Sequence, residues 1–161
     1  LIGDADPMIR RLHRVKVLRV ERAEKAIKTQ QACLQAAHRR HQEAVQTSQD
    51  YHLWRIDEEQ RLFDQRKNTT LNCKDLEKWQ RQIASLREKE ANYELECAKL
   101  LERLANERER LTLCQKMLQQ ARHKENKFLE LVRREDEDEL NQQHYQEEQE
   151  QEEFLQHHRN A

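Results

Sequence analysis

The sequence has almost none of the two residues that make tight turns, with one glycine and one proline in 161 residues. Multi-stranded sheets and phosphate-binding loops depend on such residues, which excludes the Rossmann fold, the β-sandwich, the TIM barrel and the P-loop. Only 35% of the residues are hydrophobic and 5% are aromatic, while 38% are charged. With a mean hydropathy of −1.25, the chain lacks the apolar side chains that a compact globule of this length must bury.

The chain also lacks a surplus of either charge, a long hydrophobic run and a cysteine cluster. Lys and Arg number 30 and Asp and Glu number 31, for a formal net charge of −1, whereas nucleic-acid-binding proteins usually carry a basic surplus. We find no run of about 18 apolar residues and no signal-peptide core. The cysteines form no CxxC pair, so we expect free thiols in a cytoplasmic protein and not a zinc site. They are Cys33, Cys73, Cys97 and Cys114.

What the sequence does contain is a hydrophobic repeat of about 3.5 residues, which is typical of a coiled coil when it persists over many turns. In the second half, only Glu90, Glu107 and Glu125 interrupt the apolar stripe. Its other members are Leu76, Trp79, Ile83, Leu86, Tyr93, Cys97, Leu100, Leu104, Leu111, Cys114, Leu118, Ala121, Phe128 and Val132. A thinner stripe runs through Val20, Ala23, Ile27, Gln30, Leu34, Ala37, His41, Ala44, Ser48, Tyr51, Arg55, Glu58 and Leu62. Outside this frame, which suggests a phase shift at either end, lie Leu12, Val15, Leu18, Trp54 and Ile56.

The stretch between the two stripes predicts a turn. Asn68, Thr69 and Thr70 compete with helical hydrogen bonding through their own side chains, and either Asn72 or Asp75 is suited to cap the next helix. The sequence therefore predicts an all-α protein. Its fold is expected to be two long helices in an antiparallel coiled-coil hairpin, with the C-terminal helix longer and overhanging.

We divide the chain into five segments. Residues 1–7, LIGDADP, hold the glycine and the proline, and we interpret them as a cloning remnant before a natural start at Met8. If the turn centres near residue 71, the basic residues after Met8 face the region where the acidic residues begin. The remaining segments are helix one over 8–67, the hairpin turn over 68–75, the paired part of helix two over 76–134, and an acidic overhanging helix or tail over 135–161.

Three segments of the chain resemble the YscO family, a coiled-coil component of the bacterial injectisome type III secretion apparatus. They are MIRRLHRVKVLRVERAEKAI from Met8, NCKDLEKWQRQIASLREKEA from Asn72 and REDEDEL from Arg134. The resemblance covers residues 8–161. The flagellar counterpart of this family, FliJ, is a two-helix antiparallel hairpin similar to the rotor γ subunit of F-type ATPases.

The resemblance implies a non-enzymatic stalk and adaptor of the type III export ATPase. Such a protein links the ATPase hexamer to the cytosolic domain of the export gate, binds secretion chaperones, and works in the bacterial cytoplasm at the cytoplasmic face of the apparatus. The resemblance also implies that the protein is mobile and can itself be exported. By helical spacing, the gate- or chaperone-binding positions implied are Tyr51, Trp54, Trp79, Ile83 and Leu86.

Two interpretations of these residues are open. Trp79, Ile83 and Leu86 lie on the predicted stripe, so packing in the core near the turn is the alternative to a partner surface. Phe63 adds to the aromatic residues at this end, where two helices need large rings least, and this favours docking.

We interpret the basic run that opens helix one as facing the ATPase, because adjustable charged contacts suit a pore around a stalk. The residues are Arg10, Arg11, Arg14, Lys16 and Arg19. A basic run before heptads is also the pattern of a bZIP-like DNA-binding arm. Glu21 and Glu24 interrupt the run, and the acidic segment lies across from it, which argues against DNA.

No nucleophile, base and orienting residue can be combined, because two helices leave no concave pocket that excludes water. His38 and His41 come nearest to a metal pair, but no carboxylate is assured opposite them. We therefore expect a monomeric hairpin without enzyme activity, cofactor, metal, nucleic-acid partner or membrane insertion. The rival hypothesis is a generic structural coiled-coil spacer or dimer with no role in secretion.

Overall fold

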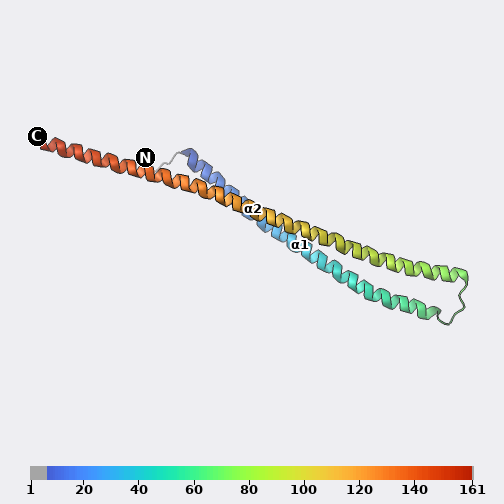
Figure 1. The fold of residues 1–161 in the computed structure, drawn as a ribbon. Coiled ribbons are helices and arrows are strands. Elements are labelled where there is room, and N and C mark those ends of the chain that lie inside the picture. The colour runs from blue at the N-terminus through green and yellow to red at the C-terminus, as the bar shows by residue number, and fades with distance from the viewer. Residues whose placement is uncertain (1–6, 161) are drawn as a thin grey trace. The chain divides into compact units, whose positions relative to one another are not determined.

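The structure, a computed structural model, describes residues 7–160 and contains two helices. Helix α1 spans Pro7–Arg66 and helix α2 spans Cys73–Arg159 (Figure 1). Among the described residues there is no strand, so the predicted all-α hairpin with a longer second helix is confirmed. Pro7 is the first residue of α1, a position where its missing N–H costs nothing, and the other six residues interpreted as a remnant lie outside the described residues.

The turn is closed by hydrogen bonds from both helix ends. The Asp75 N–H donates to Asn72 Oδ1 at 2.8 Å, so of the two predicted caps Asn72 serves α2. The Arg66 guanidinium donates to the Asp75 carbonyl at 2.9 Å and to Gln82 Oε1 at 3.2 Å. The side chain of Arg66 thus joins the last turn of α1 to the first turns of α2.

The chain forms two compact units, which are described separately. Unit 2 is Thr29–Thr112 and contains the turn, while unit 1 combines residues 7–28 with residues 113–160. In each unit, a segment of α1 packs antiparallel against a segment of α2 (Figure 1). A turn centred at residue 71 would pair Tyr51 with residue 91 and Arg10 with residue 132. In the structure Tyr51 meets Leu86 in unit 2 and Arg10 meets Asp136 in unit 1, so the register is shifted by a few residues in each unit.

The predicted stripes form the contact between the helices. Every stripe residue within 79–132 and within 20–62 is half-buried or buried, whereas Leu76 at the start is 40% exposed. The residues assigned outside the frame are all exposed. The apolar side chains that are most enclosed are Leu104 at 3%, Ala37 at 5% and Leu62 at 8% exposed.

Each glutamate that interrupts the α2 stripe is met by a polar side chain of α1. In unit 2, Glu90 pairs with Arg55 and His52, and Gln30 donates both to the Glu107 carbonyl at 3.0 Å and to its carboxylate. In unit 1, His13 lies 2.9 Å from Glu125. A buried carboxylate is tolerated only with such partners, so these three layers fix which residues face one another.

Candidate functional site

Beside the turn in unit 2, the two helices leave an open groove of about 650 Å³, here called the tip groove. Its apolar lining is Ile56 from α1 and Trp79, Ile83 and Ala84 from α2, and Glu59, Gln60, Gln80 and Arg87 form its polar edge. Within the described residues, the Trp79 indole N–H is buried without an acceptor, which is unfavourable in an ordinary core. Trp79 and Ile83 therefore lie on the stripe and also line a surface that is open to a partner.

The other three predicted gate-binding residues are placed differently. The Tyr51 hydroxyl donates to the Leu86 carbonyl at 2.9 Å, and its ring centroid lies 5.0 Å from that of Tyr93, so Tyr51 belongs to the helix–helix contact. Burial raises its pKa, with the neighbouring Tyr93 and Glu90 adding to the effect. Trp54 lies against Tyr51, with ring centroids 5.4 Å apart, but remains 50% exposed.

Leu86 lines a second open groove of about 450 Å³, whose lining shares no residue with the tip groove. Most of that lining is charged or polar, including Glu58, Arg61, Lys78 and Arg81. The five predicted residues therefore all lie in unit 2, but they do not line one common groove. Of the five, Trp79 and Ile83 line the tip groove.

An exposed hydrophobic row on α1 was not recognised as a unit from the sequence. Leu53, Ile56 and Phe63 are 64%, 47% and 47% exposed, and their spacing places them on one side of the helix. Phe63 also contacts Trp79 across the turn region, with ring centroids 6.5 Å apart. The available signal was the helical spacing of apolar residues outside the coiled-coil frame.

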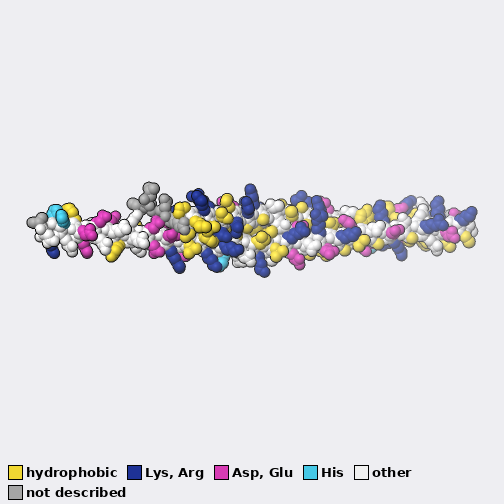
Figure 2. All heavy atoms as spheres, turned by 90° about the horizontal axis from the view of Figure 1, so that it is seen from above, with side chains coloured by type: hydrophobic (Ala, Val, Ile, Leu, Met, Phe, Trp, Pro, Cys, Tyr) yellow, Lys and Arg dark blue, Asp and Glu magenta, His cyan; other side chains and the backbone are white. Residues whose placement is uncertain are grey.

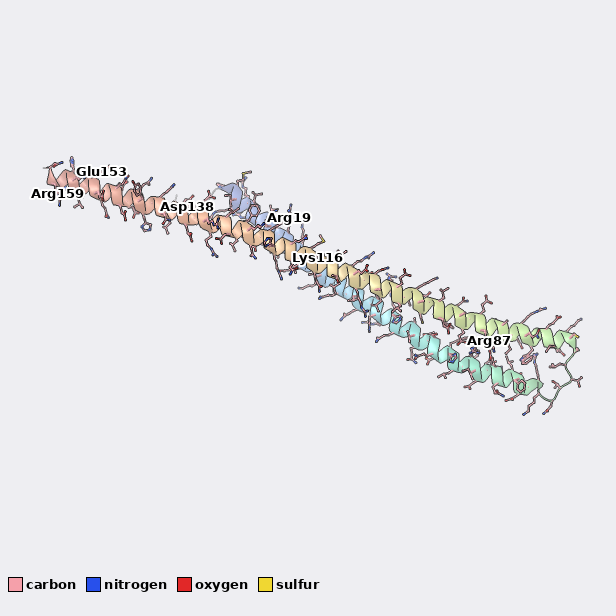
Figure 3. The ribbon with its side chains drawn as sticks, viewed as in Figure 1. Arg19, Arg87, Lys116, Asp138, Glu153 and Arg159 are labelled. Atoms are coloured by element: carbon pink, nitrogen blue, oxygen red, sulfur yellow. The ribbon has the colours of Figure 1, made fainter. Side chains whose placement is uncertain are left out.

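A network of ion pairs crosses unit 2 next to the tip groove. Arg55 pairs with Glu90 and, at 2.8 Å, with Glu59, which also pairs with Arg87 at 3.1 Å (Arg87 is labelled in Figure 3). Hydrogen bonding by His52, helped by Arg55, lowers the pKa of Glu90. Burial alone would raise the pKa of Glu59, but hydrogen bonds from Arg87 and Arg55 outweigh it and lower the pKa. Both carboxylates are thus held in the charged form.

The predicted ATPase-facing residues all lie in unit 1. Arg10 pairs with Asp136 at 2.8 Å, while Arg11, Arg14 and Arg19 are exposed (Arg19 is labelled in Figure 3). Lys16 is half-buried, and its Nζ lies 5.3 Å from the centre of the Phe128 ring, a distance at which a cation and an aromatic ring attract each other.

The comparisons with known proteins agree with this geometry. A family model described as type III secretion protein YscO matches residues 9–157. The fold also superposes on a crystal structure of the type III secretion protein YscO from Vibrio parahaemolyticus with a TM-score of 0.87 and 39% sequence identity, over 91% of this chain and 92% of the other. The chain belongs to the YscO family of type III secretion proteins.

YscO is a family of secretion proteins and not a known enzyme family, and its members have their partners within the secretion system. In the part of the chain that the structure describes, no three His, Cys, Asp or Glu side chains are grouped as metal ligands. None of the described helices is long and apolar enough to cross a membrane.

Proposed function

We propose that this YscO protein is the non-enzymatic stalk and adaptor of the type III export ATPase. It links the ATPase hexamer to the cytosolic domain of the export gate and binds secretion chaperones. It acts as a monomeric hairpin in the bacterial cytoplasm, at the cytoplasmic face of the secretion apparatus, and needs no cofactor. The unit 2 surface binds the gate or a chaperone, and the basic residues of unit 1 face the ATPase.

The observation that carries the proposal is the tip groove. Trp79 and Ile83 line an open groove, and Trp54, Leu53 and Phe63 are exposed nearby. A two-helix coil that served only as a spacer would not need these apolar side chains at its surface. Large exposed apolar surfaces on soluble proteins mark binding sites, and tryptophan is enriched among the residues that dominate binding energy. The groove therefore favours a docking end over the generic spacer.

The basic segment supports the second half of the proposal. Among the residues that the structure describes, Arg11, Arg14 and Arg19 take part in no ion pair, so their charges are available to a partner. Exposed charges of this kind steer association and tolerate changes of geometry. Both properties suit a stalk that is held inside a ring of ATPase subunits.

We expect Trp79→Ala combined with Trp54→Ala to reduce capture of the gate's cytosolic domain by about ten-fold or more, since truncating interface tryptophans often costs at least about 2 kcal/mol. The measurement is a pull-down of the full chain with the purified gate domain and, separately, with the ATPase hexamer. Capture of the ATPase should not change. Phe154→Ala removes an aromatic residue that is also exposed, at 62%, and serves as the matched control.

Circular dichroism melting of each variant separates docking from core packing. If the double variant melts early, Ile56→Asp tests the same groove, because its side chain is 47% exposed and a charge there should block docking without opening the helix contact. Undiminished capture by both variants would contradict gate binding at the tip groove. A chain truncated after residue 134 that still captures both partners would show that the acidic segment is needed for neither.

A further inference from the structure

In unit 1, the exposed hydrophobic residues gather on one side of the helix pair. The coiled-coil repeat has seven positions, named a to g, and the residues that contact the other helix occupy a and d. On one flank of this contact, each helix carries the g and c positions. Within residues 7–28 and 113–134 of unit 1, every large exposed hydrophobic residue except Leu18 and Leu129 occupies a g or c position. Figure 2 shows hydrophobic and basic side chains next to one another where residues 7–28 run beside α2.

The same flank is positively charged. Within 7–28 and 113–134, its positions contain no Asp or Glu, and its basic residues include Arg19, Lys124 and Lys127. We call this surface the cationic strip and define it by Leu12, Val15, Arg19, Met117, Lys124 and Leu131. Leu12, Met117 and Leu131 are 39%, 64% and 44% exposed, so apolar and basic side chains alternate along it.

The charges of the strip are not neutralised within the chain. On the opposite flank, Glu24 lies 3.5 Å from Arg122, and Arg10 pairs with Asp136. By contrast, among residues 7–160, neither Arg19 nor Lys124 forms an ion pair. Burial and the cations Arg19 and Lys124 lower the pKa of Lys16, which is consistent with a coiled-coil register that places Arg19 opposite Lys124.

In an antiparallel coiled coil, g positions of the two helices face each other, and opposite charges there stabilise the pair. Placing Arg19 opposite Lys124 does the reverse, since like charges repel. The arrangement therefore does not serve the hairpin itself. Apolar residues that share one flank with uncompensated cations are instead the complement of a third helix with an apolar stripe and acidic flanks.

We propose that the cationic strip is the docking surface for a single amphipathic helix of a partner protein, with acidic residues on both sides of its apolar stripe. The helix lies along the g and c flank that α1 and α2 share in unit 1 and packs on Leu12, Met117 and Leu131. Its carboxylates pair with Arg19 and Lys124. The inference goes beyond the proposed stalk function, because it concerns the chemistry of the bound segment and not which protein supplies it.

The probe is a synthetic helical peptide of three heptads, about 21 residues, with Leu at a and d, Glu at e and g, and no Lys or Arg. We expect the full chain to bind it in a fluorescence anisotropy titration and to lose affinity as salt is added. Arg19→Glu with Lys124→Glu should weaken binding by about ten-fold or more, because the carboxylates of the peptide would then meet like charges. Leu12→Ser with Leu131→Ser should weaken it without changing the salt dependence.

Matched controls lie outside the strip. Lys28→Glu with Lys116→Glu makes the same change of net charge, and Leu18→Ser with Leu129→Ser removes two leucines that are 54% and 40% exposed. Both control variants should bind the peptide like the unchanged chain. Equal weakening by controls and strip variants, or no binding by the unchanged chain, would overturn the proposal. So would sedimentation as a dimer that Arg19→Glu and Lys124→Glu dissociate, since the occupant would then be a second copy. If the peptide binds through the cationic strip but the chain does not capture the ATPase, the docking proposal stands and the proposed stalk function is refuted.

Discussion

Replacing Leu104 with Ala is expected to lower the free energy of unfolding by about 2–5 kcal/mol. Leu104 is the most enclosed side chain of the described structure, at 3% exposed, and it sits at the contact between α1 and α2 in unit 2. A contact one layer thick has few neighbours that can move in to fill the space. The measurement is urea unfolding followed by circular dichroism.

The matched control is Leu101→Ala, three positions away on α2, where the side chain is 52% exposed. Exposed substitutions usually change stability by no more than about 0.5 kcal/mol, and leucine and alanine are both good helix formers. Similar losses for Leu104→Ala and Leu101→Ala would mean that helix propensity, and not packing between α1 and α2, holds the hairpin together.

Arg55→Met is expected to destabilise unit 2 strongly at neutral pH, and more than the double change Arg55→Met with Glu90→Leu. Removing one partner leaves a half-buried carboxylate without its main cation, whereas removing both leaves an apolar contact. Only 14% of the Arg55 side chain and 12% of the Glu90 side chain are exposed, so water compensates little. Melting temperatures of the two variants, compared with that of the unchanged chain, measure the difference.

The same network gives the unchanged protein a defined response to acid. The pKa values of Glu59 and Glu90 are lowered from 4.5 by folding, so their contribution is present above the ordinary pKa and is lost as pH falls through the lowered values. Between neutral pH and about pH 3, the unchanged chain should therefore lose more stability than Arg55→Met with Glu90→Leu. Parallel pH profiles for the two chains would show that the network contributes nothing.

The fold follows from the sequence because its signal is a repeat. The stripe from Trp79 to Val132 repeats with the coiled-coil period over many turns, and every one of its members is buried or half-buried in the structure. The turn was equally readable, since Asn68, Thr69 and Thr70 favour local hydrogen bonds over helix. Both patterns are set by residues close to one another in the sequence, so they can be recognised from one sequence alone.

The surfaces can be predicted less completely from the sequence, because they depend on which residues of the opposite helix lie next to each side chain. Glu90 and Glu125 were visible as interruptions, but their partners Arg55 and His13 could be assigned only once the register was known to within a residue. Trp79 and Leu86 occupy equivalent positions in the repeat, yet they line different grooves. The local orientation of each side chain decides this, and a repeat does not specify it.

The most direct test of the central claim, that one hairpin joins two partners through two different surfaces, is photo-crosslinking in secreting bacteria. A benzoylphenylalanine group is placed at the position of Trp79 in one strain and at that of Arg14 in another, and the captured proteins are identified by mass spectrometry. The account predicts that position 79 captures the export gate or a secretion chaperone and that position 14 captures the export ATPase. Capture of the same protein at both positions, or only of a second copy of the chain, would contradict it.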